Sequence, residues 1–310
     1  MRVVFLGTPE FAVPSLHALA AGNHDVMAVF TQPDRPKGRS HQLAESPVKI
    51  AARSLGIDVF QPERIRRPES VEQLRQLAPD MMVVVGYGQI IPQILIDLPR
   101  YGILNVHASL LPKYRGAAPI QWAIAKGETE TGVTIMQIDA GLDTGDMLLK
   151  SVVPIGPDET APELSARLAP LGAALLIETM RQVEEGSVAK EKQNDSEASQ
   201  APILKKEDGL IDWSRPAWQI YNRLRGFTPW PGAYTHFRGE QLSVLRAKPA
   251  QGGVAGQGIL HVENRRVLAG AGEGTALELL EVQLAGKKRM PAAAWLSGAR
   301  LPANFRLGSD

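Results

Sequence analysis

The sequence of 310 residues contains no cysteine. This absence excludes disulfide bonds, a catalytic thiolate and metal sites with cysteine ligands. A chain without disulfides fits a reducing compartment, so we expect a cytoplasmic protein. Five of the six histidines show no spacing typical of metal ligands, and we therefore expect no metal site: His17, His24, His41, His236 and His261.

Long apolar runs and aromatic residues are also scarce. No run approaches the roughly 18 residues that a membrane span needs, and residues 2–6 are too few for a signal-peptide core. Hydrophobic residues make up 44%, charged residues 22% and aromatic residues 5% of the chain, which excludes disordered, collagen-like and fibrous proteins. At about 100 to 200 residues per domain, this length predicts about two domains, which can work as a monomer.

A net positive charge is absent from the first two thirds of the chain and is found in the last third. Residues 205–310 hold 15 Lys and Arg against 9 Asp and Glu, a net charge of +6, whereas residues 1–204 carry a net charge of −5. Such a basic segment favours an acidic partner, nucleic acid being the commonest, because clustered cations displace counterions from phosphates. A solvated basic surface is the alternative.

The N-terminal half alternates short apolar runs with helix-like segments. Near-continuous Val, Ile and Leu runs separated by helices predict a Rossmann-like, mostly parallel sheet with helices on both faces. The first turn reads GTPEFA, without the G-x-G-x-x-G sequence that seats a dinucleotide, so a nucleotide-dependent oxidoreductase is not favoured. The predicted strands are residues 2–6, 26–31, 81–85, 103–107 and 133–138, and the predicted helices begin at Thr8-Pro9 and Ser46-Pro47.

The second half predicts a different architecture. The Ala/Leu-rich stretch at residues 161–185 predicts one long helix that is bent at Pro170, and residues 187–206 have the composition of a linker. We therefore expect a catalytic domain over residues 1–188, a linker over 189–206 and a basic domain over 207–310. After a helix at residues 216–227, five short strands between Gly-rich turns predict a small OB-like antiparallel β-barrel: 233–237, 241–248, 258–262, 267–269 and 276–283.

The run ILNVHASLLP at residues 103–112 places two polar side chains on one strand. Side chains alternate faces along a strand, so Asn105 and His107 point the same way while Leu104 and Val106 face the opposite layer. This surface lies at the carboxyl end of a predicted parallel strand, where open α/β sheets bind ligands. The alternative is purely structural: Asn105 and His107 at the end of a strand serve only to donate hydrogen bonds to carbonyl groups of the loops.

An acidic, Gly-containing turn, DAGLDTGD, follows the strand at residues 133–138. Gly141 and Gly145 permit tight turns, so Asp143 can be aimed back toward His107. A plain turn or a calcium loop is the alternative, but the ligand spacing of an EF-hand is absent.

These three side chains come without a serine or cysteine nucleophile, so the substrate itself supplies the nucleophile. An amide such as that of Asn105 stabilises an oxyanion that exists only in the transition state. An aspartate beside a histidine orients the ring and favours imidazolium, which relays protons near neutral pH. Acyl transfer to an amine fits these groups.

The chain resembles the 10-formyltetrahydrofolate-dependent formyltransferase family, and within it the branch that formylates methionyl-initiator tRNA. The resemblance extends over nearly the whole chain and rests on GTPEFA, SPVK, VVVGYGQIIP, LNVHASLLPKYRGAAPIQWAI, GVTIMQIDAGLDTGDML and the basic C-terminal part behind a linker. It implies 10-formyltetrahydrofolate as the formyl donor and the α-amine of methionyl-initiator tRNA as the acceptor, for translation initiation.

The resemblance also implies roles for individual residues. Asn105, His107 and Asp143 match the family's catalytic centre. The S-L-L-P segment of the family's folate site matches Ser109, Leu110, Leu111 and Pro112.

Basic residues outside the catalytic centre are candidates for tRNA binding. The polar loop at residues 31–43 contains Arg35, Lys37 and Arg39, and Arg39 matches the main contact of a family loop that enters the acceptor stem. Lys205 and Lys206 at the linker's end are further candidates, as are Arg223, Arg225 and residues 287–289. Trp213, Trp218, Trp230 and Trp295 could stack on bases, but tryptophan is more often part of a core.

Two rival functions remain. A formyltransferase for a small amine, such as glycinamide ribonucleotide or an amino sugar nucleotide, shares the chemistry but has little use for a basic domain and an Arg/Lys loop. A non-catalytic nucleic-acid-binding protein is disfavoured because Asn105, His107 and Asp143 are all present.

Overall fold

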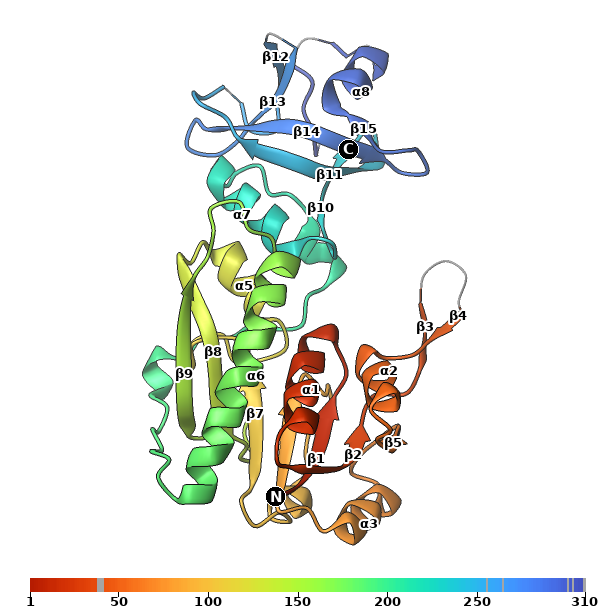
Figure 1. Ribbon diagram of the computed structural model, residues 1–310. Coiled ribbons are helices and arrows are strands. Elements are labelled where there is room, and N and C mark those ends of the chain that lie inside the picture. Colours follow the sequence, from red (N-terminus) through yellow and green to blue (C-terminus); the bar gives the residue numbers. More distant parts are fainter. Residues whose placement is uncertain (38–41, 255, 264, 300, 303, 309–310) are drawn as a thin grey trace. The chain divides into compact units, whose positions relative to one another are not determined.

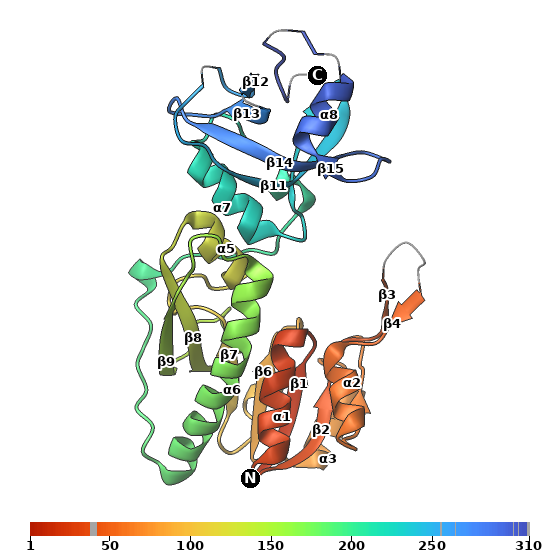
Figure 2. The same ribbon diagram turned by 45° about the horizontal axis from the view of Figure 1, so that its top comes forward.

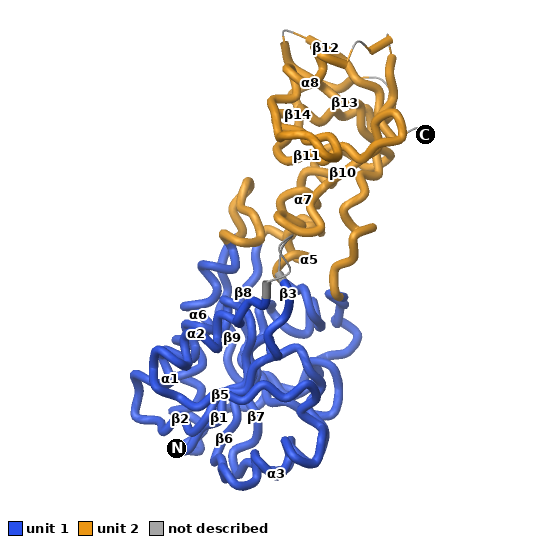
Figure 3. Tube along the Cα trace, turned by 90° about the vertical axis from the view of Figure 1, so that its right-hand side faces the viewer, with its two compact units in different colours: residues 1–119, 130–154, 164–202 blue, residues 120–129, 155–163, 203–310 orange. Residues whose placement is uncertain are grey.

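The computed structural model describes residues 1–37, 42–254, 256–263, 265–299, 301–302 and 304–308. The chain forms two compact units. The first consists of residues 1–119, 130–154 and 164–202, and the second of residues 120–129, 155–163 and 203–310 (Figure 3).

A seven-stranded sheet in the order β5-β2-β1-β6-β7-β8-β9 forms the centre of the first unit (Figure 1). The first five strands in this order run parallel, which confirms the predicted sheet, whereas β8 and β9 are antiparallel to their neighbours. The interior strands are apolar and buried, as sheets covered on both faces require. The strands are β1 (Arg2–Gly7), β2 (Asp25–Phe30), β5 (Val59–Phe60), β6 (Met81–Val85), β7 (Ile103–His107), β8 (Glu130–Gln137) and β9 (Met147–Pro154).

Of the two helix starts predicted in the first unit, the one at Ser46 has the expected side-chain cap and the one at Thr8 does not. Ser46 caps α2 as predicted, since its Oγ accepts a hydrogen bond of 3.1 Å from the Lys49 backbone. Thr8, which was predicted to begin the first helix as its N-cap, does not cap it: its Oγ1 donates to the Tyr87 carbonyl at 3.2 Å and so joins the ends of β1 and β6. The helices are η1 (Glu10–Ala12), α1 (Val13–Ala21), α2 (Pro47–Ser54), α3 (Pro68–Leu77), α4 (Gln93–Ile96) and α6 (Ala161–Glu185).

The long helix α6 covers one face of β7 and β8 (Figures 1 and 2). The contact is close at Gly172, where a Cβ atom would lie 2.8 Å from Cγ1 of Val106. Val106 therefore faces the helix. Because neighbouring residues of a strand face opposite sides, Asn105 and His107 lie on the face that α6 leaves free.

A short hairpin interrupts the loop predicted at residues 31–43. It consists of β3 (Arg35–Lys37) and β4 (Gln42–Ala44). The buried Lys49 ammonium pairs with Asp34 and Glu45 at its base. The hydrogen bond from Lys49 lowers the pKa of the Asp34 carboxyl, so the pair persists at neutral pH.

The second unit is built on an antiparallel sheet in the order β10-β11-β14-β13-β12, with β15 beside β14. This confirms the predicted C-terminal β domain. Helix α7 packs on the sheet to form one core with Trp213 and Trp295. The elements are α5 (Pro119–Lys126), η3 (Lys206–Gly209), α7 (Ala217–Phe227), β10 (Ala233–Phe237), β11 (Glu240–Pro249), β12 (Leu260–Glu263), β13 (Arg266–Gly270), β14 (Ala276–Leu284), β15 (Met290–Pro291) and α8 (Ala292–Ala299).

Most of helix α5 belongs to the second unit, although its place in the sequence suggests the first. Its Trp122 ring meets Phe227 of α7 edge-on, with centroids 5.2 Å apart. A Cβ atom on Gly226 would lie 2.8 Å from the Gln121 carbonyl oxygen, so only glycine permits this approach. Most of α5 therefore belongs with α7, although it lies between β7 and β8 in sequence.

The segment at residues 187–202 belongs to the first unit, whereas the sequence predicted a linker over 189–206. It contains the short helix η2 (Asp195–Glu197) and is otherwise extended chain. Among the residues that the structure describes, no helix has the length and apolar character to cross a bilayer.

Candidate active site

Three polar side chains converge at the carboxyl end of β7. Asn105 and His107 come from the strand itself and are 9% and 5% exposed. Nδ2 of Asn105 lies 3.4 Å from Oδ1 of Asp143, and Nδ1 of His107 lies 3.7 Å from Oδ2 of the same carboxylate. The structure thus brings together the three residues predicted as catalytic. Their roles remain a prediction.

The second nitrogen of the His107 ring identifies its tautomer. Nε2 lies 2.9 Å from the Tyr114 carbonyl oxygen. A carbonyl oxygen only accepts, so Nε2 carries a hydrogen, and Nδ1 is the nitrogen that gains or loses a proton. That nitrogen faces Asp143.

Asp143 is held in a left-handed backbone conformation, with φ of 53°. Asparagine and aspartate tolerate this conformation better than most residues. The Gly116 backbone N–H donates to Oδ2 of Asp143 at 2.8 Å, which fixes the position of the carboxylate. Oδ1 remains directed at Asn105.

Two close contacts shape the turn that carries Asp143. A Cβ atom on Gly141 would lie 1.9 Å from Thr144 Oγ1, and one on Gly145 would lie 1.8 Å from the Gln137 carbonyl oxygen. Asp139 closes the turn by accepting from Gly141 N at 3.0 Å and from Thr144 Oγ1 at 2.7 Å. The glycines therefore permit a turn that directs Asp143 toward β7.

Gly145→Ala is expected to lower the free energy of unfolding by about 1–3 kcal/mol, because the added methyl group forces the backbone of the turn to shift. Urea unfolding measures the change. Gly298→Ala in α8 is the control, since a Cβ atom there meets nothing within 4 Å and alanine favours a helix. Equal stability losses in the two variants would contradict the packing argument.

The segment predicted to bind folate follows His107 directly. Ser109 is fully buried, and its Oγ donates to the Lys113 carbonyl at 2.6 Å. Leu111 is also buried and packs with Met136 and Met147, whereas Leu110 and Pro112 are partly exposed. Ser109 and Leu111 thus support the turn after β7, and Leu110 and Pro112 retain exposed surface. The folate contacts of these four residues remain a prediction.

The predicted tRNA-binding residues lie in two places. Arg35 is exposed in β3, Lys37 ends the same strand, and Arg39 lies outside the described residues. Lys205 and Lys206 are exposed at the start of the long C-terminal part of the second unit. Their roles remain predictions.

Arg225 was wrongly considered as a phosphate contact. It is 5% exposed, and its guanidinium donates to the carbonyls of Gly156 and Glu159. Burial lowers the pKa of Arg225. Trp213 and Trp295 are buried as expected, whereas Trp218 and Trp230 are 49% and 57% exposed.

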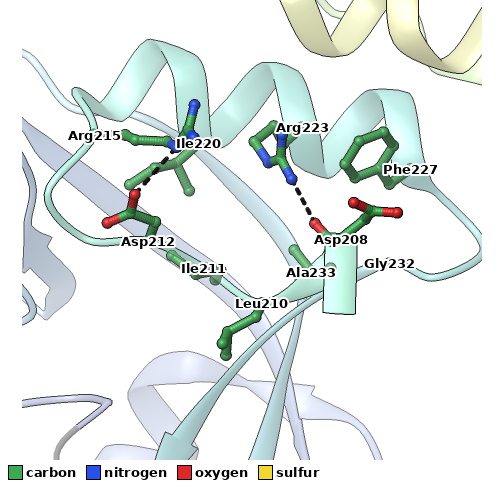
Figure 4. A pocket seen from close by; sticks show the side chains of 11 residues that line it. Asp208, Leu210, Ile211, Asp212, Arg215, Ile220, Arg223, Phe227, Gly232 and Ala233 are labelled. Carbon is green, nitrogen blue, oxygen red and sulfur yellow. Dashed lines mark hydrogen bonds and ion pairs between the residues drawn. The ribbon is translucent and has the colours of Figure 1, made fainter. Parts of the chain in front are cut away.

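A small cavity in the second unit lies between α7 and the segment at residues 208–212 (Figure 4). The Arg223 guanidinium donates to the Asp208 carbonyl beside it at 2.8 Å. The cavity volume is about 10 Å³, which is enough for a single water molecule. It is therefore too small for a substrate.

Sequence reasoning missed three groups that hold the site. These are the Tyr114 carbonyl on His107, the Gly116 N–H on Asp143, and the Gln193 side chain. Gln193 Nε2 donates to the carbonyls of Asp143 and Gly145 at 2.8 Å each. Tyr114 and Gly116 belong to the KYRG sequence that follows SLLP, which was a signal, whereas Gln193 lies in a polar stretch without one.

The arrangement can donate a hydrogen bond from an uncharged amide, hold a carboxylate and move a proton at a histidine. It offers no serine or cysteine nucleophile beside His107 in the contacts of the described residues. Within those residues, no group of three or more His, Cys, Asp or Glu side chains is arranged to hold a metal ion. Transfer of a group between two bound molecules fits this chemistry.

Comparison with known proteins identifies related chains over both units. The family model "Formyl transferase" matches residues 1–180, and "Formyl transferase, C-terminal domain" matches residues 203–300. A methionyl-tRNA formyltransferase of Solibacter usitatus is 59% identical over 308 residues, and one of Koribacter versatilis is 58% identical over 309. Each alignment covers 99% of both chains.

A solved structure shares the fold at lower identity. It is the N-formyltransferase from Helicobacter canadensis in complex with folinic acid and dTDP-3-aminofucose. The TM-score is 0.68 at 19% identity, and the match covers 89% of this chain and 98% of the other.

Proposed function

Because this chain belongs to the formyl transferase family, we propose that it transfers the formyl group of 10-formyltetrahydrofolate to the α-amino group of methionyl-initiator tRNA. The observation that carries this proposal is the similarity to methionyl-tRNA formyltransferases over both units, at 59% and 58% identity. The clustering of Asn105, His107 and Asp143 supports it independently. The product is the formylated initiator used to begin translation.

The folate supplies a formyl carbon bonded to its N10. The acceptor amine forms a new N–C bond to this carbon, the N10–C bond breaks, and the proton lost by the amine balances the one gained by N10. Attack by the amine places negative charge on the formyl oxygen. An amide donor aimed at that oxygen stabilises the transition state more than the ground state.

Asn105 is the group suited to the oxyanion. Its Nδ2 carries two hydrogens, of which one faces Asp143, so the other can bind the formyl oxygen. The amide is uncharged and almost buried, and it therefore provides a fixed dipole where water is scarce.

His107 and Asp143 are suited to manage the proton. The Nε2 hydrogen of His107 is committed to the Tyr114 carbonyl, so only Nδ1 exchanges a proton with the reacting amine. The Asp143 carboxylate, held by Gly116 N–H, stabilises the imidazolium that results. The distance of 3.7 Å exceeds a hydrogen bond, as is common before substrates bind.

Ser109, Leu110, Leu111 and Pro112 follow His107 and are proposed to line the folate site. The partly exposed Leu110 and Pro112 provide apolar surface for the ring system, and the buried Ser109 and Leu111 hold the turn in place. Arg35, Lys37, Arg39, Lys205 and Lys206 are proposed to contact the tRNA.

Purified protein supplied with 10-formyltetrahydrofolate tests the function. We expect rapid formylation of charged initiator tRNA and slow formylation of charged elongator tRNA and of free methionine. An amino sugar nucleotide and glycinamide ribonucleotide are included as small amines. Comparable rates on free methionine or a small amine would contradict the proposal and favour a small-amine formyltransferase.

Charge reversal at Lys205 or Lys206 tests tRNA binding by the second unit. Each change to Glu is expected to raise KM for the tRNA severalfold with kcat nearly unchanged, because phosphate contacts contribute binding that is equal in the ground and transition states. Each is also expected to reduce the slope of log affinity against log salt by about one.

Arg100→Glu is the matched control for these charge reversals. Arg100 is exposed and lies before β7, at the amino ends of the parallel strands and opposite the site. If Lys205→Glu and Lys206→Glu behaved like this control in KM and in salt slope, the two lysines would have no part in tRNA binding.

A further inference from the structure

We infer that Gln193 is a positioning residue for formyl transfer, which holds the Asp143 turn in place from a strap formed by residues 187–202. The inference rests on the proposed function and adds a residue to its site. The strap follows α6 and runs beside β9 as extended chain (Figures 1 and 2).

The amide of Gln193 uses both of its ends. Nε2 donates to the Asp143 carbonyl and to the Gly145 carbonyl, each at 2.8 Å. Oε1 accepts from Nε of Arg115 at 2.9 Å. Both amide hydrogens and one acceptor are therefore engaged, which orients the side chain without ambiguity.

Arg115, which donates to Oε1 of Gln193, is itself held in place. It is 6% exposed, and its terminal nitrogen pairs with Asp195 of the strap at 2.8 Å. A buried guanidinium needs partners for its donors, and here the strap provides them. Gln193 thus lies between a fixed cation and the backbone of the catalytic turn.

The strap is also bonded to the residues that flank the turn, at the start of β9 and at the end of β8. Met147 and Glu191 exchange two hydrogen bonds, of 2.8 and 2.9 Å. Lys190 Nζ donates to Oε1 of Gln137 at 2.8 Å, just before the turn begins. The turn is therefore held on both sides of Asp143.

Further along, the same strap contacts the segment that supports His107. The Tyr114 N–H donates to Ser199 Oγ at 2.9 Å, and the Tyr114 carbonyl accepts from His107. Arg115 N donates to the Ser199 carbonyl at 2.8 Å, and Ala201 N to the Arg115 carbonyl at 2.7 Å. One strap therefore positions the supports of both the histidine and the aspartate.

The position of the turn affects catalysis because the turn carries Asp143. The Asp143 carboxylate lies 3.7 Å from His107 and 3.4 Å from Asn105. A displacement of about 1 Å in a catalytic group costs up to about a hundredfold in rate. Without Gln193, the carbonyls of Asp143 and Gly145 lose their donors, and the carboxylate loses a fixed position. The expected deficit lies in kcat, since Gln193 itself contacts no substrate in the proposed function.

Two substitutions in the full chain distinguish the contact of Gln193 with the turn from its contact with Arg115. Gln193→Ala removes the bonds to the Asp143 and Gly145 carbonyls and the bond from Arg115. Gln193→Glu keeps an acceptor for Arg115 but replaces the donor with an oxygen that repels the two carbonyls. Asn194→Ala is the matched control, because the hydrogen bonds of the Asn194 side chain to described residues stay within the strap, at Ser196 and Glu197.

Steady-state formylation of methionyl-initiator tRNA is measured with each variant, together with its melting temperature. We expect Gln193→Ala to lower kcat at least tenfold and Gln193→Glu at least as much, with KM for the tRNA nearly unchanged and a melting temperature that is lowered but stays above the assay temperature. Asn194→Ala is expected to match the wild type.

Other outcomes overturn the inference. A Gln193→Glu variant with normal kcat would show that only the Arg115 contact matters, and a loss of kcat that tracks a loss of folded protein would show a purely structural role. Equal effects of Gln193→Ala and Asn194→Ala would also refute it. A wild-type chain that does not formylate the tRNA contradicts the proposed function instead, so the two failures are distinguishable.

Discussion

Asn105→Ala is expected to lower kcat by about 10²- to 10³-fold, the usual cost of losing one oxyanion donor. The Asn105 amide is an uncharged donor on the face of β7 left free by α6, and its Nδ2 lies 3.4 Å from Oδ1 of Asp143. Its loss removes stabilisation of the charge that develops on the formyl oxygen. Formylation of methionyl-initiator tRNA at saturating substrates measures the effect.

The same change should leave the fold nearly as stable as before. The Asn105 side chain is held by a hydrogen bond of 3.4 Å to Asp143, and loss of this bond costs about 1 kcal/mol or less. Asn23→Ala, in an exposed turn before β2, is the control for replacing an asparagine. If Asn105→Ala retained wild-type kcat, Asn105 would have no role in the transition state.

Asp143→Asn is expected to lower kcat by about 10²- to 10⁴-fold, the range for loss of acid–base function. Asparagine keeps an acceptor for the Gly116 N–H and tolerates the positive φ of 53°. The change therefore removes the negative charge beside His107 with the turn preserved. Without that charge, the imidazolium formed by proton transfer loses its stabilising partner.

Asp139→Asn tests whether any charge loss in the turn has this effect. Asp139 is exposed, and its Oδ1 accepts from Gly141 and Thr144, which the oxygen of an asparagine can also do. Its charge is screened by solvent, so kcat should change little. Equal losses in the Asp139 and Asp143 variants would show that the turn, and not the carboxylate at 143, is what catalysis requires.

Local sequence was sufficient to predict most elements that carry the site. The continuous apolar runs indicated the parallel strands, because a strand that is covered on both faces is apolar at every position. Ser46-Pro47 indicated the start of α2, because a cap bonds to a backbone N–H only a few residues away. The antiparallel strand β9, the hairpin β3–β4 and helix α8 were not predicted. Helix α5 was also not assigned to the second unit, since its contacts with α7 lie about a hundred residues away along the chain.

What the sequence determined by itself is the chemistry available at the site. The alternation of a strand puts Asn105 and His107 on one face, and two glycines permit the turn that carries Asp143. What only the tertiary structure decided is how these groups are held. The Gly116 N–H, the Tyr114 carbonyl and the Gln193 amide meet them across 7 to 50 residues of chain. A backbone N–H or carbonyl has the same chemistry at every position, so packing, and not residue type, determines which of them supports a catalytic side chain.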